Sequence, residues 1–542
     1  MKDFIIGDDT FQVGLVVASD PHVELPNAVI LFYPEKYAGK LLPHVNAGNY
    51  LCYVESMEAD WDSNDIRSTY SSVDDQIQKT LLSSIRSIEE GSPDDKEMAG
   101  EFASYWEPHD SLYYFVSESR PINLVASFSQ GRKIPNVNQL SVYSRETEDD
   151  YRRWLSQRNQ IAKDSLYKVG LIRVKPTHIS GISWPPESLS NVLEWLRLVD
   201  RPAFDKMVDY FATKQSNYHI LLLDVFKQDM IAFQVQLNPN ILNHKRKLCR
   251  LSGRQRKRYA TILASKPAVE SFHRLGVVKA DKKTILTRNR RRPEIGDLST
   301  KNIALIGCGT IGSHLAGLLI RAGAGCGAAD FHLYDPDRLE PHNYSRNALG
   351  SAYFDRNKAE AMSEQLKSSS HLVHSILGIP KAFPISADRI GAYDIVLDAT
   401  GRPPVSRRLA YKARELDDER RPILIHGFND GNGRISKVII DSGDACYGCL
   451  LSNTEFYNSD EMDIRFTHID ERNEKRISCG NTYTPYDAAV SVITAALMQD
   501  AALQTLEDNF TWTYSEHVLD GRVFVQPMIL TAQVNCRVCN GR

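Results

Sequence analysis

The spacing of apolar and polar positions changes along the chain and divides it into three regions. In residues 1–112, apolar residues recur in strand-like runs at 11–17 and 28–33, ahead of a polar stretch with helical spacing at 74–90. Strands followed by a long amphipathic helix are typical of a small α+β domain. The first region is therefore predicted to be such a domain.

The second region, residues 113–284, combines an apolar strand at 220–226 with an amphipathic helix at 188–198. We find no catalytic signature in it, and we interpret it as a mixed α/β linker domain. A polar, basic segment at 287–293 lies near the start of the third region, residues 285–542.

In the third region, apolar strands alternate with helical segments. The strands are expected at 303–306, 331–334 and 395–397. Strands that alternate with helices predict a mostly parallel sheet covered by helices, which is the Rossmann-like arrangement. The chain as a whole is therefore expected to be α/β.

Composition narrows the class of protein. At 542 residues the chain exceeds one hydrophobic core, and its 42% apolar residues, 25% charged residues and net charge of -3 are ordinary for a soluble globular protein. This charge favours neither nucleic acid nor a membrane as partner, and no apolar run approaches the roughly 20 residues of a membrane-spanning helix. Acids near the N-terminus argue against a signal peptide, and the nine cysteines, four of them in paired motifs, predict a reducing, cytoplasmic location.

A glycine-rich loop follows the first of these strands. Gly307, Gly309 and Gly312 let the backbone approach phosphate groups, and they lead into a helix at 313–322 whose N-terminus attracts anions. Asp335 ends the next strand, where a carboxylate accepts hydrogen bonds from ribose hydroxyls. The pattern predicts a nucleotide site rather than a purely structural turn.

Charged residues beyond this loop favour ATP over a nicotinamide cofactor. Adenylation brings a carboxylate against the α-phosphate of ATP, so cations must neutralise phosphate charge and an acid must hold magnesium. Arg346 and Lys358 suit the first role, and Asp398, at the carboxyl end of a strand, suits the second. Taken singly, Arg346 and Lys358 are equally well explained as solvated surface charges.

Two Cys-x-x-Cys motifs near the C-terminus have the spacing of a four-thiolate zinc site. They comprise Cys446, Cys449, Cys536 and Cys539. A zinc ion held by four sulfurs has no open position for a reactant, so we predict that this site is structural.

The glycine loop, the charged residues after it and the two Cys-x-x-Cys motifs follow one another in an order that resembles the ThiF/MoeB/ubiquitin-activating family. The resemblance covers roughly residues 285–542. In that family a glycine loop, a D-x-D, an N-x-x-R, a lysine and a strand-end aspartate form the ATP site. The resemblance implies that ATP and Mg²⁺ are bound by Asp335, Asp337, Asn343, Arg346, Lys358 and Asp398. It also implies that the four paired cysteines hold the family's structural Zn²⁺ and that the enzyme is a homodimer.

Among the other cysteines, Cys479 has the clearest chemical role. It follows a polar, loop-like stretch at 453–475 and precedes a helix, whose N-terminus favours the nucleophilic thiolate. In the family, a loop cysteine accepts the activated carboxylate as a thioester; the alternative is a small residue packed beneath the loop. We interpret Cys308 and Cys326 as packing residues, and Cys249 has no clear partner.

The N-terminal region resembles the core of ubiquitin-conjugating enzymes, which has a His-Pro-Asn element, a glycine, the catalytic cysteine and a later tryptophan. The corresponding residues are Pro43, His44, Gly48, Cys52 and Trp61. His44 stands where the family has its asparagine, and it is a candidate oxyanion donor or general base. Asn46 is a second candidate for this role. Cys52 is predicted to be a conjugating nucleophile, the alternative being a buried cysteine at a strand end.

Basic runs lie at 245–250, 254–258 and 290–292. Such runs usually form a solvated helix face, which is the interpretation we favour, although clustered charge also binds nucleic acid or acidic proteins. A third option is that an arginine before the glycine loop reaches the ATP phosphates of a partner subunit.

The complete layout resembles the fused activating/conjugating protein of bacterial type II CBASS anti-phage systems. The resemblance implies that the C-terminal carboxylate of a cyclic-nucleotide synthase (CD-NTase) is adenylated, transferred to Cys479 and then Cys52, and conjugated to a target lysine. Two alternatives stay open. A sulfur-carrier adenylyltransferase of thiamin or molybdopterin biosynthesis would not need the 43–52 element. A non-catalytic nucleotide-binding scaffold would not need the ordered set of charged residues.

Overall fold

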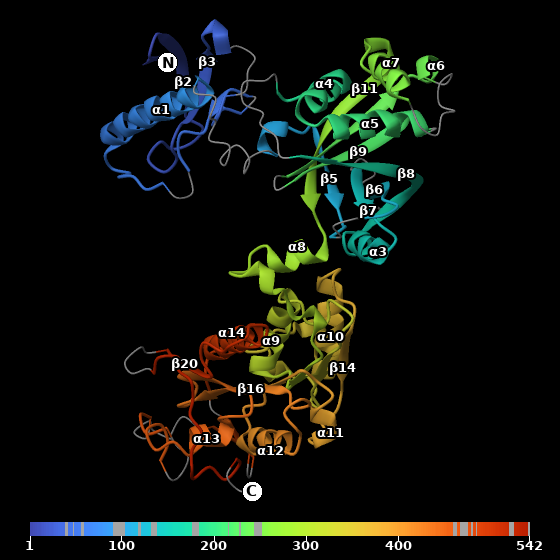
Figure 1. The fold of residues 1–542 in the computed structure, drawn as a ribbon. Coiled ribbons are helices and arrows are strands. Elements are labelled where there is room, and N and C mark those ends of the chain that lie inside the picture. Colours follow the sequence, from blue (N-terminus) through green and yellow to red (C-terminus); the bar gives the residue numbers. More distant parts are fainter. Residues whose placement is uncertain are drawn as a thin grey trace. The chain divides into compact units, whose positions relative to one another are not determined.

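The computed structural model describes most of the chain. The described residues are 1–37, 42–46, 48–55, 59–89, 103–117, 121–131, 138–175, 184–214, 216–226, 229–242, 252–458, 463–466, 475–478, 481–483, 485–519 and 525–539. The chain folds into two compact units, one of Met1–Tyr151 with Asn159–Ala280 and the other of Arg152–Arg158 with Asp281–Arg542 (Figure 1).

The N-terminal part of the first unit is an antiparallel sheet with one long helix, α1 (Ile66–Glu89), packed on one face. The four strands follow chain order: β1 (Lys2–Ile6), β2 (Asp9–Val16), β3 (Asn27–Phe32) and β4 (Tyr50–Leu51). Alternate strand residues such as Phe11 and Ile30 are buried in one apolar cluster with Leu81 of the helix. The two predicted strands and the predicted helix are confirmed, and the helix starts earlier than expected.

The rest of the first unit is a closed seven-stranded barrel in the order β10-β11-β5-β7-β6-β8-β9. Its strands are β5 (Asp110–Tyr114), β6 (Val125–Gly131), β7 (Gln139–Tyr143), β8 (Gln160–Val174), β9 (Tyr218–Val225), β10 (Met230–Leu237) and β11 (Val269–Lys279). Apolar side chains such as Leu112, Val142 and Leu222 form one buried core. β5 spans the domain boundary predicted at residue 112, and it pairs with β7 and β11.

Helices accompany the barrel strands: α3 (Glu148–Gln157), α4 (Leu189–Val199), α5 (Arg201–Thr213), α6 (Pro239–Leu242) and α7 (Gly253–Leu263). α4, α5 and α7 share a second apolar cluster with β8, β9 and β10. The predicted helix at 188–198 is confirmed as α4, and Ser188 caps it by accepting a hydrogen bond from the Asn191 N–H.

The second unit contains a seven-stranded sheet in the order β14-β13-β12-β15-β16-β17-β20. Its strands are β12 (Ile303–Ile306), β13 (Phe331–Tyr334), β14 (Ile376–Ile379), β15 (Ile395–Asp398), β16 (Ile423–Asp430), β17 (Ile435–Asp441) and β20 (Tyr514–Val518). Two further strands, β18 (Lys475–Ser478) and β19 (Asn481–Tyr483), form a separate antiparallel pair. The first five strands in this order are parallel, and β17 and β20 are antiparallel. The mostly parallel α/β sheet predicted from the sequence is confirmed.

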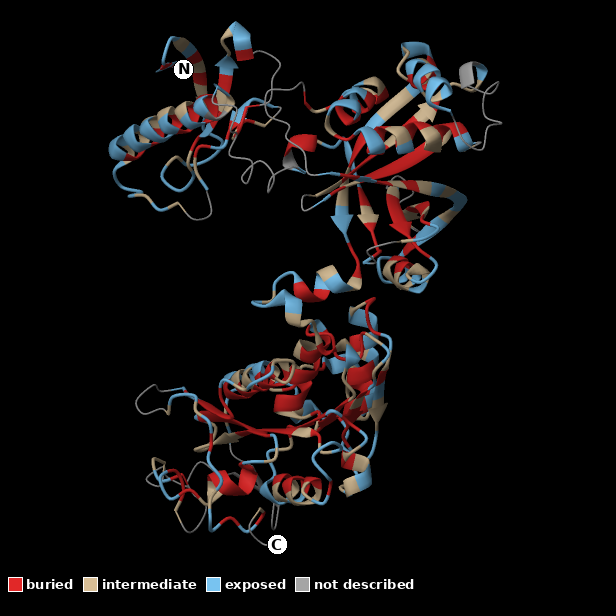
Figure 2. Ribbon diagram, viewed as in Figure 1, coloured by how far each residue is buried: buried red, intermediate tan, exposed pale blue. Residues whose placement is uncertain are grey.

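Helices cover both faces of this sheet: α9 (Thr310–Arg321), α10 (Lys358–Ser369), α11 (Ala387–Ile390), α12 (Pro403–Ala413), α13 (Tyr447–Leu451) and α14 (Ala488–Gln504). A further short helix, α8 (Lys282–Thr287), precedes the first strand of the sheet. α9, α10 and α14 share one apolar cluster, whereas α11, α12 and α13 share another. Figure 2 shows the buried residues concentrated on the strands between these two layers. Within the described part of the chain, no helix combines the length and apolarity needed to cross a membrane.

Candidate nucleotide, metal and thiol sites

The glycine loop joins β12 to α9 where the strand order reverses, since β13 lies on one side of β12 and β15 on the other. Gly307 has a φ of 92°, which favours glycine, and its N–H donates to the Tyr334 carbonyl (2.8 Å). A Cβ at Gly312 would lie 1.8 Å from the Gly307 carbonyl oxygen, whereas a Cβ at Gly309 would meet nothing within 4 Å. The first turn of α9 is therefore packed tightly on the loop and leaves space for a phosphate group at its N-terminus.

Asp335 follows β13 and is buried beneath this loop. Its carboxylate accepts hydrogen bonds from the backbone N–H groups of Cys308 (2.7 Å) and Asp337 (2.8 Å). Burial raises the pKa of the Asp335 carboxyl above its usual value, and these two N–H groups offset the rise only in part. Each oxygen accepts one of these bonds, so each retains acceptor capacity for a ribose hydroxyl.

Lys358 opens α10 beside the same aspartates. Its Nζ lies 3.4 Å from a carboxylate oxygen of Asp337, and the lysine is only 8% exposed. Asn357 caps the helix, and its amide also donates to the backbone carbonyls of Asp335 (2.8 Å) and Asp337 (3.0 Å). Asn357 was not among the residues predicted from the sequence, although an asparagine just before a helix is a recognisable capping signal.

Arg346 lines an open cleft of about 820 Å³. Its guanidinium carbon lies 4.5 Å from the centroid of the Tyr486 ring, and its carbonyl accepts a hydrogen bond from His314 of α9 (3.2 Å). The Asn347 amide donates to the Cys308 carbonyl (3.0 Å). These contacts connect the segment around Arg346 to the glycine loop. The other residues that line the cleft are Glu340, His342, Asn343, Ser345, Pro485, Tyr486 and Asp487.

Asp398 ends β15, the strand next to β12, and is buried. One carboxylate oxygen accepts hydrogen bonds from the N–H (3.1 Å) and hydroxyl (2.7 Å) of Thr400, and the other from Ser406 (2.5 Å) and His426 Nδ1 (3.0 Å). Burial raises the pKa of Asp398. The charge attraction and hydrogen bond from His426, together with the hydrogen bonds from the Ser406 and Thr400 hydroxyls, lower it by more, so the pKa lies below its usual value. His426 was not predicted from the sequence as a partner of Asp398, because it lies on the neighbouring strand β16.

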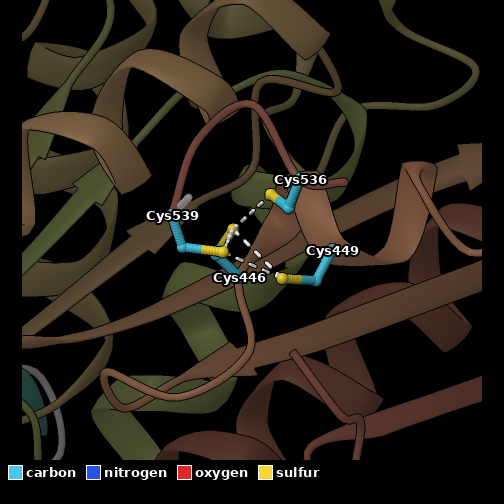
Figure 3. A group of neighbouring side chains, drawn as sticks. All are labelled: Cys446, Cys449, Cys536 and Cys539. Atoms are coloured by element: carbon cyan, nitrogen blue, oxygen red, sulfur yellow. Dashed lines mark hydrogen bonds between the residues drawn. The ribbon is translucent and has the colours of Figure 1, made fainter. Parts of the chain in front are cut away.

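The four paired cysteines come together, three of them buried, at the start of α13 and near the C-terminus (Figure 3). Their sulfur atoms all lie within 4.8 Å of one another, and four of the separations are between 3.2 and 3.8 Å. Tetrahedral Zn–S bonds of about 2.3 Å would place the sulfurs about 3.8 Å apart. The cluster therefore fits one metal ion, as the motif spacing predicts.

A buried ionic cluster binds the segment after the first Cys-x-x-Cys motif to the sheet. Lys437 of β17 is fully buried, and its ammonium donates to Asp430, Tyr457 and Asp463 over 2.6 to 2.8 Å. Arg465 contacts both Asp463 and Glu516 of β20 over 2.6 to 2.9 Å. Burial raises the pKa of Asp463, but Arg465 and Lys437 outweigh this effect, so its pKa lies below the usual value.

We expect Lys437→Met to lower the free energy of unfolding by about 3–5 kcal/mol, because Asp430 and Asp463 lose the buried cation that they share. Of these two carboxylates, Arg465 still pairs only with Asp463. Urea unfolding of the full chain at constant zinc concentration measures the loss. Arg420→Met is the matched control, since Arg420 forms an exposed ion pair with Asp417, and it should cost less than about 1 kcal/mol. Equal losses in the two variants would contradict the role of Lys437.

Cys479 lies outside the described residues. The chain around it is described as β18, which ends at Ser478, and β19, which begins at Asn481. The helix expected after it is α14, which begins at Ala488 with Asp487 at its N-cap position. The thioester role of Cys479 therefore stays a prediction from the sequence.

Cys52 directly follows β4 and is exposed, so the alternative of a buried strand-end cysteine is wrong. Its N–H donates to the His44 carbonyl (2.7 Å), which brings the two residues side by side. His44 has a φ of 62°, and the Asn46 side chain accepts a hydrogen bond from the Tyr50 N–H (2.9 Å). Asn46 thus binds the backbone at the start of β4, whereas Trp61 donates to the His22 carbonyl (3.2 Å).

The remaining sequence features have structural explanations where they are described. Cys308 and Cys326 are buried, as predicted, whereas Cys249 and the run at 245–250 lie outside the described residues. The run at 254–258 lies on α7 and is largely exposed, except that Arg256 pairs with Asp209 (2.7 Å). A mainly solvated helix face is thus confirmed for this run.

Comparisons with known proteins match two separate parts of the chain to different families. The model of Prokaryotic E2 family B matches residues 6–115, and that of the ThiF family matches residues 284–533. The chain is 46% identical to the ATP-dependent ubiquitin transferase-like protein Cap2 of Vibrio cholerae, a match that covers 100% of this chain and 93% of that protein. It is 44% identical to Cap2 of Escherichia coli, over 99% of this chain and 93% of that protein. Escherichia coli MccB matches 45% of this chain and 66% of its own at 18% identity, with a TM-score of 0.35.

The fold and these matches define an adenylating enzyme of the ThiF type joined in one chain to a prokaryotic E2 domain. The chain belongs to the Cap2 family of ATP-dependent ubiquitin transferase-like proteins. This confirms the activating and conjugating class of enzyme predicted from the sequence, together with its dependence on ATP. A sulfur-carrier adenylyltransferase or a non-catalytic scaffold would not explain similarity to transferase-like proteins along the whole chain.

Proposed function

We propose that the enzyme activates the C-terminal carboxylate of a CD-NTase with ATP, carries the acyl group first on Cys479 and then on Cys52, and joins it to a target lysine. The setting we propose is CBASS anti-phage defence. The observation that carries the proposal is the end-to-end similarity to Cap2 proteins, which are named as ATP-dependent ubiquitin transferase-like. The arrangement of the nucleotide site supports its first step.

In that first step, a carboxylate oxygen of the substrate bonds to the α-phosphorus of ATP and pyrophosphate leaves. The glycine loop and the N-terminus of α9 would receive the phosphates. Arg346 and Lys358 would neutralise the charge of the two anions that meet, and Asp335 would accept hydrogen bonds from the ribose. Lys358 is well placed for this role, because burial of its side chain beside Asp337 restricts its motion.

Two metal ions belong to the proposal. Mg²⁺, when bound, would neutralise phosphate charge, and Asp398 is its proposed ligand. Because each Asp398 oxygen already accepts two hydrogen bonds, the ion would have to replace the hydroxyl of Thr400 or Ser406. Zn²⁺ would occupy the four-cysteine cluster and stabilise the fold there.

The acyl group would then pass between two thiols. The Cys479 thiolate attacks the acyl carbon and AMP leaves, and the Cys52 thiolate next displaces Cys479 from the thioester. A target amine finally attacks this second thioester, so that an amide forms and the Cys52 thiol is released. The exposure of Cys52 supports its role, and the neighbouring His44 is the proposed oxyanion donor or base.

The proposal includes a homodimer formed through the adenylation domain and a cytoplasmic location. Among the described residues, no disulfide bond joins two cysteines, which suits a reducing compartment. Sedimentation analysis of the full chain at micromolar concentration checks the dimer.

The thioester relay makes a specific prediction for two cysteine variants. With the purified chain, ATP, Mg²⁺ and a CD-NTase, Cys479→Ala should abolish every thiol-labile adduct yet retain ATP–pyrophosphate exchange within about threefold, because adenylation precedes the thiol step. Cys52→Ala should accumulate the adduct on Cys479 and form no conjugate. Non-reducing gels and mass spectrometry locate the adducts.

Cys326→Ala is the control for this experiment, because Cys326 is a buried thiol outside the zinc cluster and should leave both adducts unchanged. The proposal fails if Cys479→Ala still loads Cys52. It also fails if only a small sulfur-carrier protein supports pyrophosphate exchange.

A further inference from the structure

The stack of Arg346 on Tyr486 joins two segments that are far apart in the sequence. Arg346 lies in the turn that follows Asn343, and Tyr486 lies just before α14. The guanidinium carbon is 4.5 Å from the ring centroid. Within the described part of the chain, the Arg346 guanidinium makes no hydrogen bond or ion pair with another side chain. Its orientation is therefore determined by the aromatic ring rather than by an anionic partner.

Stacking is well suited to a cation that must bind phosphate. A guanidinium lying on a ring keeps its N–H donors in its own plane, where they are free to bind oxygen atoms. An ion pair with a carboxylate would use the same donors and would reduce the positive charge. The ring thus holds the cation without competing with an anionic ligand.

Tyr486 is itself held in place by two other contacts. Its hydroxyl lies 3.3 Å from the hydroxyl of Thr310, the first residue of α9. A Cβ at Gly433, which has a φ of 77°, would lie 2.4 Å from the Tyr486 Cβ, so the turn after β16 packs directly against the tyrosine. The tyrosine is fixed on one side by this turn and on the other by the helix that would receive the phosphates.

We propose that Tyr486 is the positioning residue for Arg346, and that it aims the guanidinium at the same phosphate groups that the N-terminus of α9 attracts. This inference rests on the proposed role of Arg346 in binding ATP. Tyr486 acts through Arg346 and needs no contact with ATP itself. The hydroxyl contact with Thr310 is secondary, because the ring face alone holds the cation.

The test measures the affinity of the full-length chain for ATP with Mg²⁺ by equilibrium dialysis. Tyr486→Leu removes the stack and should weaken ATP binding about 5- to 30-fold, which corresponds to the usual strength of a partly desolvated cation–π contact. Tyr486→Phe keeps the ring and should stay within about twofold. Arg346→Ala should weaken binding at least as much as Tyr486→Leu.

The decisive measurement is the ATP affinity of the double variant that combines Tyr486→Leu with Arg346→Ala. If Tyr486 acts only through Arg346, Tyr486→Leu should add less than about twofold to the loss caused by Arg346→Ala. A full, additive loss in the double variant would overturn the inference and leave the role of Arg346 intact. Unchanged ATP affinity in Arg346→Ala would overturn both this inference and the proposed role of Arg346.

A second pair of variants covers the case in which Tyr486→Leu disturbs folding. In Tyr486→pentafluorophenylalanine, the fluorinated ring has nearly the same shape as the phenylalanine ring of Tyr486→Phe. The electrostatic potential of its face, however, is reversed. This variant should weaken ATP binding by about as much as Tyr486→Leu while thermal stability and zinc content match those of Tyr486→Phe. Equal ATP affinity in the two aromatic variants would overturn the inference.

Discussion

Replacing Gly312 by alanine is expected to reduce ATP–pyrophosphate exchange by about 100-fold or more, because the new methyl group cannot fit beside the glycine loop. Its carbon would lie 1.8 Å from the carbonyl oxygen of Gly307, so either the loop or the first turn of α9 has to move. A displacement of about 1 Å in an element that positions the substrate lowers the catalytic rate by roughly 100-fold. Initial exchange rates with saturating ATP and protein substrate measure the effect.

Gly317→Ala is the matched control on the same helix. A Cβ at Gly317 meets only the end of the Arg321 side chain at 3.4 Å, which is ordinary van der Waals contact. Alanine also favours a helix over glycine, so this variant should be fully active and more stable by about 0.5–1 kcal/mol. Normal exchange in Gly312→Ala, or an equal loss in both variants, would contradict the tight packing of the loop.

Loss of the four-cysteine metal site is expected to have the largest effect on stability. Cys449→Ser should remove the bound zinc and lower the free energy of unfolding by more than about 4 kcal/mol, because the binding energy of a structural zinc contributes directly to folding. The ion would connect α13 to the chain near the C-terminus through a cluster that is mostly buried. Elemental analysis gives the zinc content, and thermal unfolding gives the stability.

Cys326→Ala is a control here too, because it removes a buried thiol without touching the cluster. It should retain one zinc ion per chain and lose far less stability than Cys449→Ser. Full zinc content in Cys449→Ser, or a wild-type chain that purifies without zinc and unfolds normally, would show that the cluster is not a structural zinc site.

Local signals explain why much of the fold and of the nucleotide site could be predicted. The strand at 303–306 is apolar at every position because it is buried on both faces, and Gly312 after it faces a backbone that leaves no space for a side chain. Asp335 and Lys358 stand at the end of a strand and at the start of a helix, where short-range patterns are strongest. Asn357 was missed even though its capping position is such a local signal.

The partners of these residues could not be predicted in the same way. Asp398 and His426 meet because β15 and β16 are adjacent in the sheet, and nothing in the spacing of the two residues requires that pairing. Arg346 and Tyr486 meet because α14 packs beside α9. Such contacts depend on the order of strands and the packing of helices, which a single sequence does not specify.

By itself, the sequence determined the mostly parallel α/β class of the C-terminal region, the glycine loop and the two Cys-x-x-Cys motifs, because each depends on residues close together in the chain. Only the tertiary structure decided that Cys52 is exposed, that Lys437 is buried among carboxylates and that Tyr486 holds Arg346. These outcomes depend on burial and on contacts between distant segments. The free energy of such contacts is set by which elements pack together, and not by the local pattern of the chain.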